Sequence, residues 1–269
     1  MIKEETLLSL QNNKENITSV AKALRILDTY THKKPIQKVT DISEILNLPT
    51  STTSRLMQIL ADEGFLAKDI SSTGYMLGPK VLKLGGLFVS TSKIYHEVSP
   101  ELVRLGAEIN ENAHIVILKG YEIVYLNKQM STFYSAMDSD IGQTHPAYAT
   151  SSGKVLLSDK DKNFVEQMFK GDLKKYTKNT ITDYPTFELE LEKVRTDGYI
   201  ISVGELEEHN FSVAAPVYDE NNMIVAAVSI AAPISRRSDP KKEAQFIKRL
   251  IETTESASER LSYAEDGYI

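Results

Sequence analysis

The chain has 269 residues, 41% of them hydrophobic and 25% charged, a composition typical of one large globular domain or two ordinary ones. It has no cysteine, which excludes a disulfide framework and thiolate metal sites. The net charge is −6, the first residues lack the apolar core of a signal peptide, and the longest apolar run, 223–232, is too short to cross a bilayer. We therefore expect a cytoplasmic protein with no membrane partner.

The start of the chain predicts a polar arm over residues 1–16, followed by a helix over 17–31. Four apolar side chains of this helix recur at helical spacing, and we expect them to form its buried face: Ile17, Val20, Leu24 and Leu27.

Residues 40–66 predict two short helices joined by a tight turn. The first would run over 41–47 with Thr40 as its N-cap, the turn would lie at 48–49, and the second would run over 50–63. Gly64 suits the left-handed residue that ends a helix.

The second of these helices has two different faces. Thr53, Leu56, Met57 and Leu60 would pack inward. The other side carries hydroxyls, one guanidinium and one amide but no acid, which favours contact with phosphates and base edges. We expect Arg55 and Gln58 to contact bases, and Thr50, Ser51, Thr52 and Ser54 to hold mainly phosphates. The alternative is an amphipathic helix with a Ser/Thr-rich solvated surface.

Residues 65–77 alternate around an S-S-T-G turn and predict a β-hairpin, whose Lys68 would touch the DNA backbone. Three helices and a hairpin make a winged helix-turn-helix over 17–77. Residues 1–78 contain nine basic and nine acidic side chains, so all the excess acid lies in 79–269. A neutral DNA-binding domain predicts weak binding by one copy, and therefore a dimer or tetramer on double-stranded DNA.

Gly78-Pro79 predicts the start of a linker helix over 78–94. This helix is apolar nearly all round, so it either packs on a second copy or belongs to the core of the larger domain. Residues 95–269 predict an α+β domain in which helices flank an antiparallel sheet. The expected helices are 93–110, 152–157, 161–170, 186–197 and 240–263, and the expected strands are 113–118, 121–126, 132–137, 211–218 and 224–231.

This order of motifs resembles the IclR family of bacterial transcription regulators over nearly the whole chain. The resemblance rests on A-L-R-I-L, L-P-T-S-T-T-S-R-L-M-Q-I-L, E-G-F-L and G-Y-M-L-G-P-K-V-L-K-L-G in the first half. In the second half it rests on I-G-Q-T-H-P-A-Y-A-T-S-S-G-K-V-L-L, L-E-K-V-R-T-D-G-Y, Glu205 and V-A-A-P-V-Y-D-E with V-A-A-V-S-I. It implies a dimer or tetramer, a GAF-like domain that binds a small-molecule effector, and control of a catabolic operon, here expected to be by repression.

The resemblance also implies positions for the effector-binding residues: Ser151, Ser152, Ser202, Ser212 and Ser229, with His145 near the pocket mouth. At four positions this chain differs from residues that are common in the family. Ser202 stands where many members have an acidic residue, and Ser212 where many have cysteine. Ala231 stands where some members have serine, and His209 where glycine is usual. A lining rich in hydroxyls favours a small hydroxy or keto acid, whose carboxylate would lie at the helix N-terminus near Ser152.

Ser151-Ser152-Gly153-Lys154 also fits the S-x-x-K pattern of serine hydrolases, but the companion S-D-N and K-T-G motifs are absent. We therefore expect no enzyme, with a Ser-Lys hydrolase and a ligand-free architectural DNA-binding protein as alternatives. The five histidines lack metal-ligand spacing, which predicts no cofactor and leaves only a His145/His209 metal site open.

Overall fold

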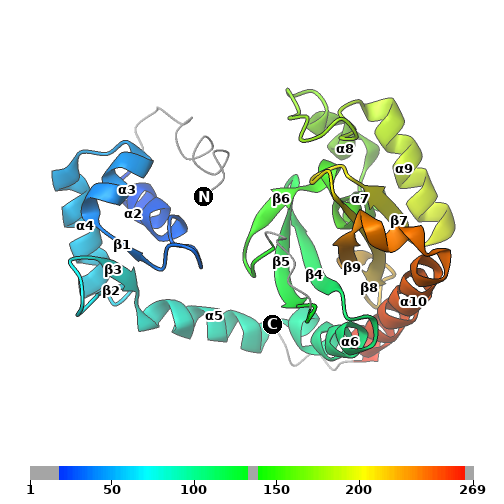
Figure 1. The fold of residues 1–269 in the computed structure, drawn as a ribbon, viewed down its shortest axis with the longest axis horizontal. Helices are drawn as coiled ribbons and strands as arrows, with labels where there is room; N and C mark the ends of the chain where they lie inside the picture. The colour runs from blue at the N-terminus through cyan, green and yellow to red at the C-terminus, as the bar shows by residue number, and fades with distance from the viewer. Residues whose placement is uncertain (1–17, 133–138, 264–269) are drawn as a thin grey trace. The chain divides into compact units, whose positions relative to one another are not determined.

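The computed structural model describes residues 18–132 and 139–263, and the chain divides into two compact units, Met1–Ser90 and Thr91–Ile269 (Figure 1). In the parts of the chain that the structure describes, no helix combines the length and the hydropathy that a membrane span requires. The two units are described separately below.

The first unit is a winged helix-turn-helix, as the sequence predicts. Its helices surround a small core, and its three-stranded antiparallel sheet has the order β1-β3-β2. The elements are α2 (Ser19–Asp28), β1 (Ile36–Gln37), α3 (Val39–Leu46), α4 (Thr50–Asp62), β2 (Leu66–Lys68) and β3 (Tyr75–Leu77).

The second helix of the motif, α4, has the predicted bounds to within one residue. It follows Pro49 and ends before Gly64, whose φ of 78° is the left-handed conformation that glycine adopts without strain. The four side chains expected to face inward are all buried: Thr53, Leu56, Met57 and Leu60. The three apolar ones pack with Ile26 and Ile42. The opposite face of α4 is therefore the one presented to solvent.

The predicted buried face of α2 is wrong at two positions, Val20 and Leu24, whereas Leu27 packs against the core as predicted. Val20 and Leu24 are 69% and 56% exposed, whereas Ile26 is fully buried. Ile17 lies outside the described residues. A second stripe at helical spacing, Ala23, Ile26/Leu27 and Tyr30, packs on α3 and α4 instead. The helix carries two overlapping apolar stripes, and packing rather than periodicity selects between them.

The predicted start of α3 is also wrong. The helix begins at Val39, two residues early, and Thr40 lies within its first turn. Asp41 accepts a hydrogen bond from the backbone N–H of Lys38 at 3.3 Å. A carboxylate at the third helical position thus bonds back to the residue before the helix, and no hydroxyl cap is needed.

Helix α5 (Pro79–Thr91) has no buried side chain, and a separate helix α6 (Lys93–Ile109) follows it. Ser92 separates them because its hydroxyl accepts from the N–H of Tyr95 at 3.2 Å, which is an N-cap. Leu82, Leu84, Leu87 and Phe88 of α5 are between 48% and 80% exposed.

The second unit is built on a six-stranded antiparallel sheet of order β6-β5-β4-β9-β8-β7. Its strands are β4 (Asn112–Lys119), β5 (Glu122–Gln129), β6 (Thr144–Pro146), β7 (Ile200–Val203), β8 (Asn210–Tyr218) and β9 (Ile224–Pro233). The strands β6 and β7 were not among those predicted, and they are the two edge strands. The predicted strand over 132–137 lies almost wholly outside the described residues.

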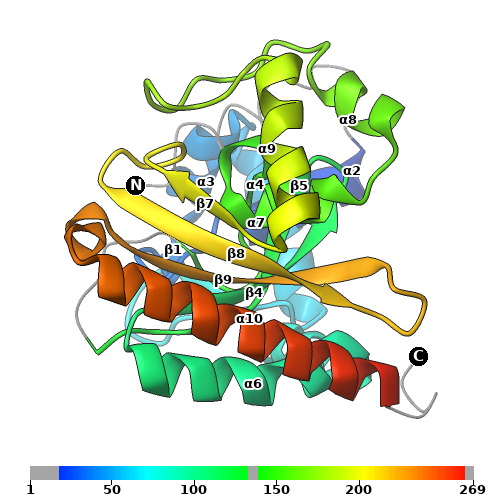
Figure 2. The ribbon, with the colours of Figure 1, turned by 90° about the vertical axis from the view of Figure 1, so that its right-hand side faces the viewer.

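Helices cover both faces of this sheet (Figure 2). Helices α6 and α10 (Pro240–Tyr263) lie side by side on one face and form a core with Leu102, Val213 and Leu250. The other face carries α7 (Ser151–Ser158), α8 (Lys162–Met168) and α9 (Tyr184–Asp197), with Val155 and Phe187 in their core. The fold is therefore α+β, as predicted.

Candidate functional site

Two neighbouring rows of residues across the sheet place polar side chains on the face toward α7. In one row Ser202 pairs with Ser212 and Ser212 with Ala231. In the next row, two residues along each strand, Ser229 of β9 pairs with His114 of β4. Because side chains two residues apart lie on the same face, these groups converge on one area of the sheet.

Helix α7 points its N-terminus at this area. Thr150 caps it, accepting from the N–H of Gly153 at 3.0 Å, and Ser151 donates its hydroxyl to Ser212 at 2.8 Å. A Cβ at Gly153 would lie 2.1 Å from the carbonyl oxygen of Ala147. Glycine therefore allows the close approach between α7 and the 3-10 turn before it, which holds the helix end over the serines.

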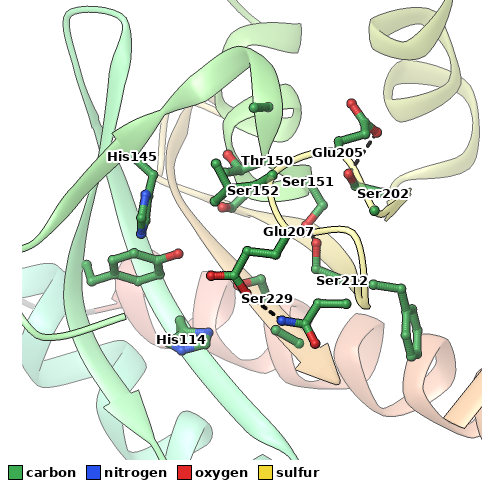
Figure 3. A pocket seen from close by; sticks show the side chains of 17 residues that line it. His114, His145, Thr150, Ser151, Ser152, Ser202, Glu205, Glu207, Ser212 and Ser229 are labelled. Atoms are coloured by element: carbon green, nitrogen blue, oxygen red, sulfur yellow. Dashed lines mark hydrogen bonds between the residues drawn. The ribbon is translucent and has the colours of Figure 1, made fainter. Parts of the chain in front are cut away.

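These groups border a cavity with a volume of about 50 Å³. Figure 3 shows the labelled serines, histidines and Glu207 pointing into it from several strands and from the α7 end. Among the described residues that line the cavity there are two carboxylates, Glu205 and Glu207, and no lysine or arginine. The lining is His114, Tyr125, His145, Ala149, Thr150, Ser151, Ser152, Ser202, Gly204, Glu205, Leu206, Glu207, Asn210, Phe211, Ser212, Ser229 and Ala231.

Lys154 lies behind this lining and is fully buried. Its ammonium donates to Glu205 Oε1 at 2.6 Å and to Glu190 Oε2 at 3.1 Å, and Ser202 donates to the same Glu205 oxygen at 2.7 Å. The ammonium is thus engaged by two carboxylates, whereas the hydroxyl of Ser151 donates to Ser212 instead. The S-x-x-K sequence therefore forms a structural ion pair here rather than a nucleophile and its base.

An aromatic wall closes the side opposite α7. The rings of His114 and Tyr125 are 5.0 Å apart, and those of Tyr125 and His145 are 5.7 Å apart at nearly right angles. Burial, and secondarily the charges of Lys128 and His145, lowers the pKa of His114 to about 3. This histidine is therefore neutral near pH 7, and its Nε2 lies 2.9 Å from the hydroxyl of Ser139.

All the residues expected around an effector line this one cavity: His145, Ser151, Ser152, Ser202, Ser212 and Ser229. His114, Tyr125, Glu207 and Asn210 also line it and were not predicted. His114 was detectable, because it interrupts an apolar strand with a polar side chain. Glu207 belongs to the turn between β7 and β8, and Asn210 is the first residue of β8. Their positions depend on the pairing of these two strands, which the sequence does not indicate.

The structure separates the two histidines considered as a metal site. His145 lies in β6 and lines the cavity, whereas His209 is exposed and does not. Within residues 18–132 and 139–263, no three histidine, aspartate or glutamate side chains are grouped so that they could hold a metal ion.

The residues predicted to face DNA share one side of the first unit. Ser51, Ser54, Arg55 and Gln58 are exposed on α4, with Thr50 exposed and Thr52 half-buried at its start, and Lys68 is exposed on β2. Gln58 donates to Asp62 at 2.7 Å, whereas Arg55 forms no hydrogen bond or ion pair with the described residues. Its guanidinium is therefore available to a ligand outside the chain.

A winged helix-turn-helix, joined to a second unit with a polar cavity between sheet and helix, defines a transcription regulator with an effector-binding domain. Residues 19–69 match the IclR helix-turn-helix domain, and residues 87–259 match the bacterial transcriptional regulator IclR C-terminal domain. The chain belongs to the IclR family, as the sequence motifs indicated, and is a regulator rather than a hydrolase.

Known proteins agree with this assignment. The HTH-type transcriptional regulator KdgR of Escherichia coli is 28% identical over 94% of this chain and 96% of its own. The HTH-type transcriptional repressor AllR of Klebsiella pneumoniae is 30% identical over 74% and 73%, respectively. An IclR homologue of Microbacterium hydrocarbonoxydans, solved in complex with 4-hydroxybenzoate, has the same fold, with a TM-score of 0.80 at 21% identity over 91% of this chain and 99% of that one.

Proposed function

We propose that this regulator is a repressor of a catabolic operon, that two or more copies bind one operator, and that a small hydroxy or keto acid controls binding. The observation that supports effector binding in this cavity is the convergence of serines from three strands on the N-terminus of α7. The first N–H groups of a helix have no partner inside the helix and favour an anion. A carboxylate at Ser151 and Ser152 would be bound there, with its hydroxyl or keto groups toward Ser212 and Ser229.

Two relatives support this proposal. The AllR relative is named a repressor, and the structural relative from Microbacterium holds an aromatic hydroxy acid. In this chain, the neutral His114 and the serine hydroxyls supply both donors and acceptors to the groups beside the carboxylate. A lining of this kind suits a ligand with several oxygens.

For the DNA half, we propose that α4 enters the major groove. Arg55 would contact a base edge, and Gln58 would do so after giving up its bond to Asp62. Thr50, Ser51, Thr52, Ser54 and Lys68 would position the unit on phosphates. Arg55→Ala should weaken operator binding by about 1–3 kcal/mol and relax specificity at one base pair. Lys68→Ala is the matched control, because loss of a phosphate contact weakens binding equally for all sequences.

Self-association is the third part of the proposal. Residues 1–78 are electrically neutral, so that one copy would grip phosphates weakly, and the exposed apolar side chains of α5 offer a surface for a second copy.

Two measurements test the proposal. Thermal shift with a panel of hydroxy acids, keto acids, aromatics and neutral sugars should show stabilisation by acids, and Ser229→Ala should reduce that shift. Electrophoretic mobility shift with the upstream DNA of the gene should show binding that the same acid weakens. Stabilisation by neutral sugars alone, or operator binding unchanged by Arg55→Ala, would overturn the corresponding half.

A further inference from the structure

The turn between β7 and β8 sends one of its own carboxylates into the effector cavity. Figure 3 shows the side chain of Glu207 extending from this turn into the space between the labelled histidines and serines. The amide of Asn210, which also lines the cavity, donates a hydrogen bond to Glu207 Oε2. The neighbouring Glu208 is exposed and pairs with Lys178 outside the cavity at 3.6 Å.

The backbone of this turn is anchored on both sides. Thr180 donates its hydroxyl to the carbonyl of Glu205 at 2.7 Å, and the N–H of Ile234 donates to the carbonyl of His209 at 2.9 Å. Gly204 takes a φ of 64°, and its carbonyl accepts from Thr177. A rotation of the Glu207 side chain therefore clears the cavity at the loss of one hydrogen bond, while the turn stays in place.

The Glu207 side chain takes up space that an effector would otherwise use. The cavity that remains has a volume of about 50 Å³, which holds on the order of four water molecules. The charge of Glu207 also opposes an acid. Lys154 does not offset this charge, because its ammonium donates to Glu205 and Glu190. The second charged side chain among the described lining residues is Glu205, which is also a carboxylate.

We propose that Glu207 is an internal competitor of the effector, and that its carboxylate occupies the cavity of the ligand-free chain until the carboxylate of an acid displaces it. This inference rests on the proposed function of the cavity as an acid-binding site. The displaced carboxylate leaves behind the Asn210 amide as a donor, and a carboxylate of the ligand can accept from it in place of Glu207.

The chain has no cysteine, so a single Ser229→Cys substitution puts one thiol on the cavity wall. We would measure the rate at which this thiol reacts with three small methanethiosulfonates, one anionic, one neutral and one cationic. The backgrounds are the chain with Glu207 intact, Glu207→Ala, Glu207→Gln and, as the matched control from the same turn, Glu208→Ala. No effector is needed, so the result is independent of whether the proposed ligand class is right.

We expect Glu207→Ala to raise the rate for the anionic reagent about tenfold or more, because both the obstruction and the negative charge are removed. The neutral reagent should also react faster with Glu207→Ala. Glu207→Gln keeps the size of the side chain, so it should accelerate the anionic reagent alone, and Glu208→Ala should change nothing.

Equal rates for all reagents in the Glu207→Ala and intact backgrounds would overturn the proposal, since the side chain would then obstruct nothing. The proposal would also be overturned if the cationic reagent reacted fast with Glu207 intact and slowly with Glu207→Gln, while the rate for the anionic reagent stayed the same. That result would make Glu207 a binding group for cations. If the labelling rates follow the proposal but no acid stabilises the protein, the acid-binding function fails and the obstruction by Glu207 stands.

Discussion

The ammonium of Lys154 lies 2.6 Å from Oε1 of Glu205, and the two side chains are 0% and 7% exposed. This ion pair joins the first helical turn of α7 to the turn after β7, and both segments border the polar cavity. A buried ion pair adds little net stability compared with a well-packed apolar pair, but removal of one partner leaves an uncompensated charge.

Lys154→Met should therefore destabilise the protein by about 3–5 kcal/mol in urea unfolding followed by circular dichroism. Lys193→Met is the matched control, because Lys193 contacts the same Glu190 at 2.6 Å from an exposed position. Its loss should cost less than about 1 kcal/mol. Similar costs for the two variants would contradict the view that burial makes the Lys154 pair important.

Gly153→Ala should destabilise the protein by about 1–3 kcal/mol, because the new methyl group would overlap the carbonyl of Ala147. It should also weaken any effector binding, since α7 must retreat from the sheet. Gly85→Ala on α5 meets no atom within 4 Å and should instead stabilise its helix by about 0.5–1 kcal/mol. Thermal unfolding should therefore show a lower midpoint for Gly153→Ala and a higher midpoint for Gly85→Ala than for the unmodified chain.

His114 should make stability depend on pH. Its pKa is near 6.5 in the unfolded chain and about 3 in the folded one. Between these values the unfolded state binds more protons, so stability is full above pH 6.5 and falls as the pH drops toward 3. The slope for one proton is about 1.4 kcal/mol per pH unit.

Urea unfolding at several pH values between 4 and 7 measures this slope. His114→Gln should reduce the slope by about 1.4 kcal/mol per pH unit, which is the contribution of one proton. An unaltered slope in His114→Gln would show that other groups cause the acid sensitivity.

Leu82→Glu should weaken the proposed self-association, because Leu82 is 80% exposed on α5, the apolar helix that we propose lies against a second copy. Sedimentation equilibrium should show a dissociation constant raised by about tenfold or more, the effect of losing one interface anchor. Leu189→Glu is the control, since Leu189 is 66% exposed on α9. Equal dissociation constants for the two variants and the unmodified chain would exclude α5 as the contact.

The sequence predicts the helix-turn-helix well because its signals are local. Pro49, Gly64 and three apolar residues with Thr53 at helical spacing determine the bounds and the buried face of α4. The exposure of Val20 and Leu24 does not follow from the local sequence. Helix α2 has two apolar stripes, and its contacts with α3 and α4 determine which stripe is buried. The strand β7 has four residues and little alternation, so its pairing with β8 is visible only in the fold.

The same distinction holds for the cavity. Its serines are found by resemblance to a family, and Ser151 and Ser152 also by their place before a helix. The approach of His114 to Ser229 depends on the register between β4 and β9, and the position of Glu207 depends on a turn between paired strands. Contacts of this kind join residues far apart in the chain, and no pattern within a short window contains them.

The first and last helices of the second unit are fastened together near the end of the chain. Arg260, in the last turn of α10, donates to the carbonyl oxygen of Glu97 at 3.1 Å and to its carboxylate at 3.0 Å. Arg260→Ala would thus leave the sheet and the cavity in place but release the beginning of α6, the point where the linker joins the second unit. Such a variant should still bind its small molecule while transmitting the signal poorly.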